Sequence, residues 1–377
     1  MIQFNIAKRV RIAILIVTFG WMGNCESVFS QDTSEAAKSG QEDRVMAIYE
    51  STKTAKTTQD FTDMVQLCQS TLDLKDLTPE NREYVNSLLG WALNRRAEVN
   101  FEKAKSLASD QDSKADATLA EAMADFDRGI IAAPQRYRSW MSRGIAHAWA
   151  SDYRNAARDF TEVLKQKTDH VPAWFNRAEV LYQMDQFEAA VKDYTSVLRF
   201  DSEDLQAITG RGHALFALKR YQDAQNDYDR VIEMASQNDV AYLNRGDVLV
   251  KLGLWKEAYA DFSRANQLAP NSTGLQRLAW MNATCPGKEV YNPELGLARI
   301  HRAVQNRPKT IADIETLAAA QASLGKFEEA VNNQRSAIQL ATATEIVDQA
   351  QEERLALYVQ EKAFRLQETK RPDSKQH

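Results

Sequence analysis

The sequence predicts an all-α protein built from a row of stacked helical hairpins. Only 14 glycines and 8 prolines occur among 377 residues, a composition that suits long helices better than a β-rich fold. A 34-residue spacing also recurs four times without a gap between residues 137 and 272. Because one short helical hairpin cannot bury its own apolar face, the repetition predicts that neighbouring hairpins stack into a solenoid.

The four central units agree at several columns. The units are 137–170, 171–204, 205–238 and 239–272. The fourth position is large, to fill the space between two helices: Trp140, Trp174, Ile208 and Tyr242. The eighth position is small: Gly144, Ala178, Gly212 and Gly246. The twentieth is always alanine: Ala156, Ala190, Ala224 and Ala258. The twenty-fourth is aromatic: Phe160, Tyr194, Tyr228 and Phe262. The small columns predict close approach of the two helices, and the aromatic column predicts packing on the next unit.

This pattern resembles the tetratricopeptide repeat family over residues 137–272. The resemblance implies a right-handed superhelical solenoid of helix-turn-helix units that binds other proteins and carries no catalytic site. The block Leu278–Gly287, followed by the segment Glu315–Val331, is similar to a terminal module of bacterial tetratricopeptide proteins of the exported type.

Degenerate units of the same kind are predicted on both sides of the central four. Upstream, residues 43–135 predict helical hairpins. The hairpin directly before the central units has its first helix at 83–101, with Gly90 in the small column of that helix. The insertion relative to a regular unit is about twenty residues, and the polar run 109–114 is expected to loop out. Downstream, residues 273–344 predict two variant units, so about seven hairpins are expected in all.

The ends of the array are predicted to be polar. Residues 345–367 are rich in Glu, Gln, Lys and Arg, which favours a helix that caps the open end of the solenoid. Residues 31–42 and 368–377 are expected to be a disordered linker and a disordered tail.

Residues 1–30 have the order of a secretory signal peptide. A positive stretch containing Lys8, Arg9 and Arg11 precedes the apolar run Ile12–Met22, and Val28–Ser30 offers a cleavage site. The run is too short to span a bilayer, which takes about 20 residues. Two alternatives stay open, an uncleaved anchor and a lipoprotein signal acylated at Cys25. The chain is expected to be exported to the periplasm or the exterior, with membrane attachment only in those two cases.

Charge and motif content exclude several classes of function. A net charge of −5 provides no basic face for nucleic acid. The five histidines are scattered and no cysteine pair has metal-ligand spacing, so no metal or other cofactor is expected. Phosphate-binding loops and known catalytic motifs are absent from the sequence. Cys68 and Cys285 lie in different units and are expected to be small core residues.

Opposite charges recur in phase along the central units. Position seven is arginine: Arg143, Arg177, Arg211 and Arg245. Position twenty-three is aspartate: Asp159, Asp193, Asp227 and Asp261. Asp125 holds the same column upstream. The spacing predicts a structural ladder of ion pairs between the helices of each hairpin. The alternative, an anion-binding stripe, is disfavoured because each arginine has a carboxylate at hand.

The resemblance implies that partners bind in a concave groove lined by the first helix of each unit. The residues in the groove columns are Met141, Ile145, Trp149, Phe175, Asn176, Glu179, Tyr182, Thr209, His213, Phe216, Leu243, Asn244, Asp247 and Val250. Exposed aromatic side chains beside carboxylates suit a peptide with apolar anchors. The alternative is that several of them pack on the neighbouring helix. The clamp by which some members hold a peptide's terminal carboxylate is incomplete, since only Asn176 and Asn244 match it.

The expected function is therefore non-catalytic recognition of a protein or peptide outside the cytoplasm. One alternative is a structural or self-assembling envelope subunit that uses its convex face or terminal units. Another is an enzyme with its chemistry in residues 43–135, where no catalytic motif is found.

Overall fold

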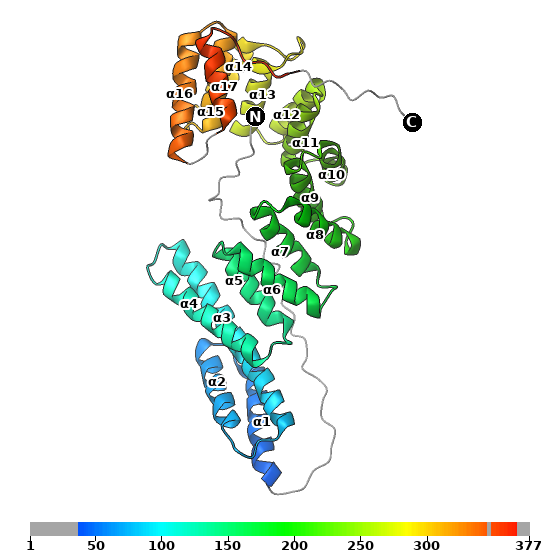
Figure 1. Ribbon diagram of the computed structural model, residues 1–377, viewed down its shortest axis with the longest axis vertical. Helices are drawn as coiled ribbons and strands as arrows, with labels where there is room; N and C mark the ends of the chain where they lie inside the picture. The colour runs from blue at the N-terminus through cyan, green and yellow to red at the C-terminus, as the bar shows by residue number, and fades with distance from the viewer. Residues whose placement is uncertain (1–36, 345–347, 368–377) are drawn as a thin grey trace. The chain divides into compact units, whose positions relative to one another are not determined.

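The computed structural model describes residues 37–344 and 348–367, and all seventeen regular elements in these ranges are α-helices (Figure 1). The predicted signal peptide, residues 1–30, and the predicted tail, 368–377, lie outside the described residues. The expected all-α fold of helix-turn-helix units is confirmed. Among the described residues, no helix is both long and apolar enough to cross a membrane.

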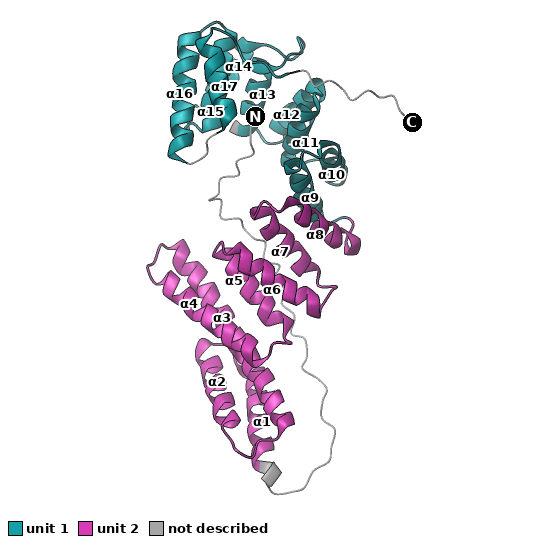
Figure 2. Cartoon of the chain, in the orientation of Figure 1, with its two compact units in different colours: residues 1–12, 203–377 teal, residues 13–202 magenta. Residues whose placement is uncertain are grey.

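The chain divides into two compact units, which are coloured separately in Figure 2. Within the described residues, the N-terminal unit ends at residue 202 and the C-terminal unit begins at residue 203. The N-terminal unit holds four consecutive antiparallel hairpins. Their helices are α1 (Ala37–Thr54), α2 (Thr58–Leu72), α3 (Pro79–Ser109), α4 (Ala115–Ala132), α5 (Tyr137–Trp149), α6 (Tyr153–Gln166), α7 (Val171–Gln183) and α8 (Phe187–Phe200).

The C-terminal unit holds four further hairpins and one unpaired helix, α17. Its helices are α9 (Leu205–Ala217), α10 (Tyr221–Met234), α11 (Asp239–Leu252), α12 (Trp255–Leu268), α13 (Ser272–Thr284), α14 (Pro293–Ala303), α15 (Ile311–Ser323), α16 (Phe327–Ala343) and α17 (Gln349–Val359). The described residues thus form eight hairpins, one more than the approximate number expected.

Helix α1 begins inside the segment predicted to be disordered. Residues 37–42 belong to it, so that part of the prediction is wrong. The reason is tertiary packing, which a polar composition does not reveal. Gln41 is buried and its side-chain amide donates a hydrogen bond of 2.7 Å to the carbonyl of Asp76, while Val45 and Ile48 enter the core of the first hairpins.

The first helix of the second hairpin is longer than predicted, and its register differs. Helix α3 runs from Pro79 to Ser109, beyond both predicted bounds, and the loop before α4 is confined to residues 110–114. Gly90 does not hold the small column. That place belongs to Ala97, which packs against Phe126 as the small residues of the central units pack against their aromatic. The insertion is therefore shorter than predicted, and Gly90 instead lies against the backbone of Gly129.

The small eighth position of the central units makes room for the aromatic at position twenty-four of the same hairpin. A Cβ atom added to Gly246 would lie 2.5 Å from the ring of Phe262, and one added to Gly144 would lie 2.8 Å from the ring of Phe160. Each ring also reaches the next hairpin, as Phe160 does at Val180. The aromatic column therefore joins the two helices of one hairpin and the following hairpin in a single contact.

The turn inside each central hairpin repeats the same backbone geometry. Its turn residue, at position fifteen of the unit, has a positive φ: Ser151, Asp185, Lys219 and Gly253. Gly325 holds the equivalent place in the hairpin of α15 and α16, and Glu361 follows α17 in the same way. Helix α17 therefore begins as the first helix of another unit.

The predicted capping helix, 345–367, is only partly helical. Helix α17 ends at Val359, and residues 360–367, which we call the C-terminal strap, are not helical. The reason lies at Arg354, seven residues before the turn at Glu361, where regular units carry Gly or Ala. Its side chain is buried and is much larger than the Gly or Ala that lets a second helix approach closely in the regular units. The prediction of a continuous polar helix is therefore wrong.

Candidate protein-binding surface on the first helices

The arginines of position seven form two parallel hydrogen bonds with the aspartate of the same hairpin. The Nε and Nη2 atoms of Arg143 lie 2.9 and 2.7 Å from the two carboxylate oxygens of Asp159. The same bidentate geometry recurs in Arg177–Asp193, Arg211–Asp227 and Arg245–Asp261. All four aspartates are buried. Arg96, which the sequence reading did not single out, makes the equivalent pair with Asp125 at 2.7 Å.

A third guanidinium bond ties neighbouring hairpins together. The Nη1 atom of Arg143 lies 2.6 Å from Asp127 of α4, and that of Arg245 lies 2.7 Å from Asp229 of α10. Arg177 donates in the same way to the hydroxyl of Thr161. Charge-assisted, bidentate bonds of this kind fix geometry as well as supplying energy. Buried carboxylates thus neutralise these arginines inside the hairpins, which is the geometry that a structural ladder requires.

The fourteen predicted groove residues are less exposed than expected. Twelve are half-buried, and Asn176 and Asn244 are buried. In the N-terminal unit, Trp149 contacts Phe101 edge-on, with ring centroids 5.8 Å apart, and Met141 and Ile145 border the core between hairpins. Several of these side chains therefore pack on neighbouring helices, which is the alternative that the sequence left open.

Helix α7 carries a polar and aromatic cluster on its groove face. The Tyr194 hydroxyl donates a hydrogen bond to the Glu179 carboxylate, and burial raises the pKa of Glu179. Phe175 meets the ring of Tyr194 edge-on, and Tyr182 does the same with Phe187. The side-chain oxygen of Asn176 is buried without a hydrogen-bond partner in the described part of the chain.

In the C-terminal unit the predicted residues of α9 and α11 meet one another. His213 and Asn244 share a hydrogen bond of 3.1 Å, and burial lowers the pKa of His213 to about 4. The Thr209 hydroxyl is turned back to the carbonyl of Leu205. Leu243 and Val250 border an apolar cluster that includes Phe262 and Met281.

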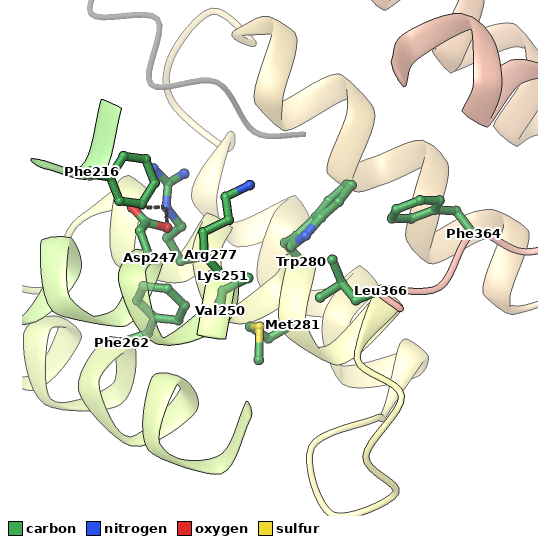
Figure 3. Close-up of a pocket in the computed structure, with 10 residues that line it drawn as sticks. All are labelled: Phe216, Asp247, Val250, Lys251, Phe262, Arg277, Trp280, Met281, Phe364 and Leu366. Carbon is green, nitrogen blue, oxygen red and sulfur yellow. Dashed lines mark hydrogen bonds and ion pairs between the residues drawn. The ribbon is translucent and has the colours of Figure 1, made fainter. Parts of the chain in front are cut away.

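A pocket opens where the first helices α9, α11 and α13 approach one another (Figure 3). Three predicted groove residues line it, Phe216, Asp247 and Val250. The other lining residues are Lys251, Phe262, Arg277, Trp280, Met281, Phe364 and Leu366. Its volume is about 50 Å³, far below the roughly 300–1,000 Å³ of pockets that enclose a small-molecule ligand. The pocket therefore suits a single side chain of a larger partner.

The charged residues of this pocket differ in their pairing. Arg277 forms an ion pair of 3.0 Å with Asp247, drawn with dashed lines in Figure 3. Burial nevertheless raises the pKa of Asp247. Lys251 extends between the rings of Phe216 and Trp280, and no dashed line reaches its ammonium group. Burial lowers the pKa of Lys251.

The C-terminal strap borders the pocket and lies on α13. The backbone N–H of Leu366 donates to the carbonyl of Thr284 at 2.9 Å, which satisfies one of the acceptors that a helix C-terminus leaves open. The ring of Phe364 faces Trp280, with centroids 5.9 Å apart. The Arg365 guanidinium stacks on Tyr291 at 3.5 Å. A short non-helical segment is thus held by one backbone hydrogen bond and by side-chain contacts on both sides of it.

Arg354 supports this arrangement from α17. Its guanidinium lies 5.8 Å from the ring centre of Trp280 and 5.9 Å from that of Phe364. It also forms a buried ion pair of 2.6 Å with Glu315 of α15. No group of three or more potential metal ligands occurs within residues 37–344 and 348–367. Cys68 and Cys285 are both buried and free.

The sequence profile described as "Tetratricopeptide repeat" matches residues 141–204 and 209–273. The chain contains tetratricopeptide repeats. Repeats of this family indicate a scaffold for protein–protein interaction, and the fold is generally non-catalytic. The comparison with curated proteins yields no match to this chain.

Solved structures resemble this chain at low sequence identity, and two with TM-scores of 0.50 or more share its fold. A tetratricopeptide repeat protein from Parabacteroides merdae is 18% identical, with 70% of this chain and 98% of that chain covered and a TM-score of 0.54. The Cut9–Hcn1 hetero-tetramer of APC/C is 12% identical over 85% of this chain and 55% of that chain, with a TM-score of 0.50. YrrB, described as a TPR protein with an unusual peptide-binding site, is 17% identical over 50% of this chain and 95% of that chain, with a TM-score of 0.42.

Seven of the ten residues that line the pocket were not among the predicted groove residues. Lys251 holds position thirteen of its unit, the groove column that Trp149 holds in the first central unit. The sequence could therefore have identified Lys251 as a groove residue. Trp280 and Arg277 belong to a variant unit whose register is harder to read. Phe364 and Leu366 follow a polar helix outside any repeat, so only the folded chain places them.

Proposed function

We propose that this protein is a non-catalytic scaffold that binds an extended segment of a partner protein on the first helices of its hairpins. The observation that carries the proposal is the C-terminal strap. A non-helical segment of the chain already lies on α13, held by a backbone hydrogen bond to Thr284 and by the ring of Trp280. The same surface continues into the pocket beside α9 and α11.

Half-buried apolar side chains support this proposal in both units. Residues such as Tyr182 and Val250 combine internal packing with partial exposure. Rigid side chains of that kind lose little conformational entropy when a partner covers them, which favours binding. Their spread over several first helices suits a segment several residues long rather than a small molecule.

Site-specific photocrosslinking tests which surface is used. The photoreactive residue benzoyl-phenylalanine replaces Tyr182 or Val250 on first helices, and Lys192 or Gln267 on the second helices of the same hairpins. Each full-length variant is exposed to light in its source cells, and the adducts are identified by mass spectrometry. We expect a partner to be captured from Tyr182 and Val250 and not from the two exposed second-helix positions.

The alternative, a structural subunit that assembles with itself, gives a different result. It predicts adducts with a second copy of the chain, formed mainly from Lys192 or Gln267. Adducts from second-helix positions alone would overturn the proposed binding surface, whatever protein they contain.

We also propose that the scaffold acts outside the cytoplasm, on the basis of the signal-like order of residues 1–30. Mass spectrometry of the protein isolated from its source cells tests this directly. A mature chain that begins at Gln31 in the exported fraction is expected. A chain that begins at Cys25 with an attached lipid would establish the lipoprotein route, and an intact chain in the cytoplasm would contradict export.

A further inference from the structure

The pocket beside α11 has an excess of one positive charge at its mouth. Arg277 and Asp247 neutralise each other at 3.0 Å. Lys251 makes no ion pair or hydrogen bond within the described residues. Three charges act on the ammonium group of Lys251. Asp247 and then Asp348, at the start of α17, raise its pKa, whereas Lys219, in the turn after α9, lowers it. Lys251 therefore shares the single carboxylate of the pocket lining with Arg277, which holds that carboxylate in an ion pair.

The surroundings of Lys251 make that charge costly to leave unpaired. Its side chain is half-buried and lies between Phe216 and Trp280 (Figure 3). Fewer water molecules can reach the ammonium group there than at the surface, and a charge taken from water needs a partner to offset its desolvation. A ligand group of opposite charge would therefore gain more here than at an exposed lysine.

The size and the walls of the pocket limit what that group can be. A volume of about 50 Å³ accommodates a carboxylate and excludes a nucleotide or a comparable cofactor. Phe216, Trp280 and Leu366 give the pocket apolar walls, which would contact the residues on either side of the carboxylate. The geometry thus combines one charged contact with flanking apolar contacts.

We infer that Lys251 is a specificity subsite that receives an aspartate or glutamate side chain from an extended partner segment with apolar neighbours. This inference rests on the proposed function, because it assumes that a partner segment lies on the first helices. It goes further in stating which residue type the segment must carry and which side chain selects it.

Peptide selection on the full-length mature chain tests the inference. A random library of displayed twelve-residue peptides is selected on the wild type, on Lys251→Met and on Lys251→Glu. Lys288→Met serves as the control, because Lys288 is an exposed lysine of the same unit. Circular dichroism and thermal unfolding verify that each variant is folded, and individual peptides are then measured by fluorescence anisotropy.

We expect peptides selected on the wild type and on Lys288→Met to share an acidic residue beside an apolar one. These peptides should bind Lys251→Met at least tenfold more weakly, since a charge-assisted bond is lost. Lys251→Glu should select lysine or arginine instead. Selected peptides without acidic enrichment, or with equal affinity for Lys251→Met, would overturn the inference alone. Failure of every variant, including the wild type, to enrich any peptide would count against the proposed function itself.

Discussion

The two carboxylates that meet a ladder arginine differ in their access to water. Asp159 is within the hairpin of Arg143 and its side chain is 4% exposed, whereas Asp127 belongs to the preceding hairpin and is 57% exposed. Both lie within 2.7 Å of a guanidinium nitrogen. The distances alone would predict equal contributions of the two ion pairs to stability. Solvent screening separates them, because an exposed ion pair contributes little to stability.

Replacing these two aspartates separately should therefore give unequal losses. We expect Asp159→Ala to lower the free energy of unfolding by about 2–3 kcal/mol, since it leaves a half-buried guanidinium without its bidentate partner. Asp127→Ala should cost less than about 1 kcal/mol. Urea unfolding followed by circular dichroism measures both. Equal losses would show that the ladder is not organised by burial.

His213 should make the stability of the C-terminal unit depend on pH. Its pKa is near 4 in the folded chain, below the ordinary value of about 6.5. The unfolded chain therefore binds the proton more tightly. The contribution of neutral His213 to the free energy of unfolding is fully present above pH 6.5, and it is lost as the pH falls from there towards 4.

We expect this single group to cost the wild type about 2 kcal/mol between pH 7 and pH 5. His213→Gln, which carries no titratable ring, should lose correspondingly less stability over the same interval. His301→Gln is the matched control, because His301 is exposed. Urea unfolding at the two pH values provides the measurement, and parallel losses in wild type and His213→Gln would contradict the assignment.

At the scale of the helix pair, the turn geometry is fixed while the residue that adopts it varies. Ser151, Asp185 and Lys219 all have φ near +60°, and Gly253 has φ of +74°. The left-handed conformation costs an L-residue roughly 1–2 kcal/mol. Three of the four central turns therefore accept a strain that the fourth avoids.

Gly253→Ala should accordingly destabilise the C-terminal unit by about 1 kcal/mol, because the alanine must adopt the left-handed conformation. Lys219→Ala is the natural control, since position 219 already carries a Cβ atom. We expect a lower thermal midpoint for Gly253→Ala and almost no change for Lys219→Ala. Equal shifts would mean that the backbone conformation is not the source of the loss.

The period of 34 residues predicts the central hairpins well because each column has one physical role. Glycine beneath an aromatic ring and arginine opposite aspartate are contacts within one or two hairpins, so the spacing alone locates them. The predicted register was wrong upstream, where an insertion interrupts the 34-residue period. Gly90 matched a small column by residue type, but Ala97 holds that place because its neighbour Arg96 is the residue that pairs with Asp125.

The candidate site was predicted only in part for a related reason. Phe216, Asp247 and Val250 follow from the family columns, because those columns line the first helices. The pocket also needs Trp280 of α13, in a variant unit, and Phe364 and Leu366, which approach it through the return of the chain after α17. No local pattern in a polar segment predicts where it docks, so these contacts follow from the tertiary structure alone.

For the molecule as a whole, the strap makes its last hairpins depend on a few side chains. In a repeat array stability is a sum of each hairpin and its contacts with neighbours. Phe364→Ala removes a half-buried ring that packs against Trp280, which we expect to cost about 1–2 kcal/mol. Hydrogen exchange should therefore accelerate in α13 and α17 and stay unchanged in α1 to α6. Exchange that increases equally along the whole chain would contradict this local dependence.

The chain after Arg354 departs from the repeat pattern of the earlier hairpins. The last hairpin of a solenoid presents an unpaired face on which a further repeat, or a second molecule, could continue the stack. Within the described residues no second helix follows α17, and the chain turns back over α13 instead. A segment of fewer than ten residues thus covers part of the last described first helices, so the proposed binding surface and a covered surface lie side by side on α13.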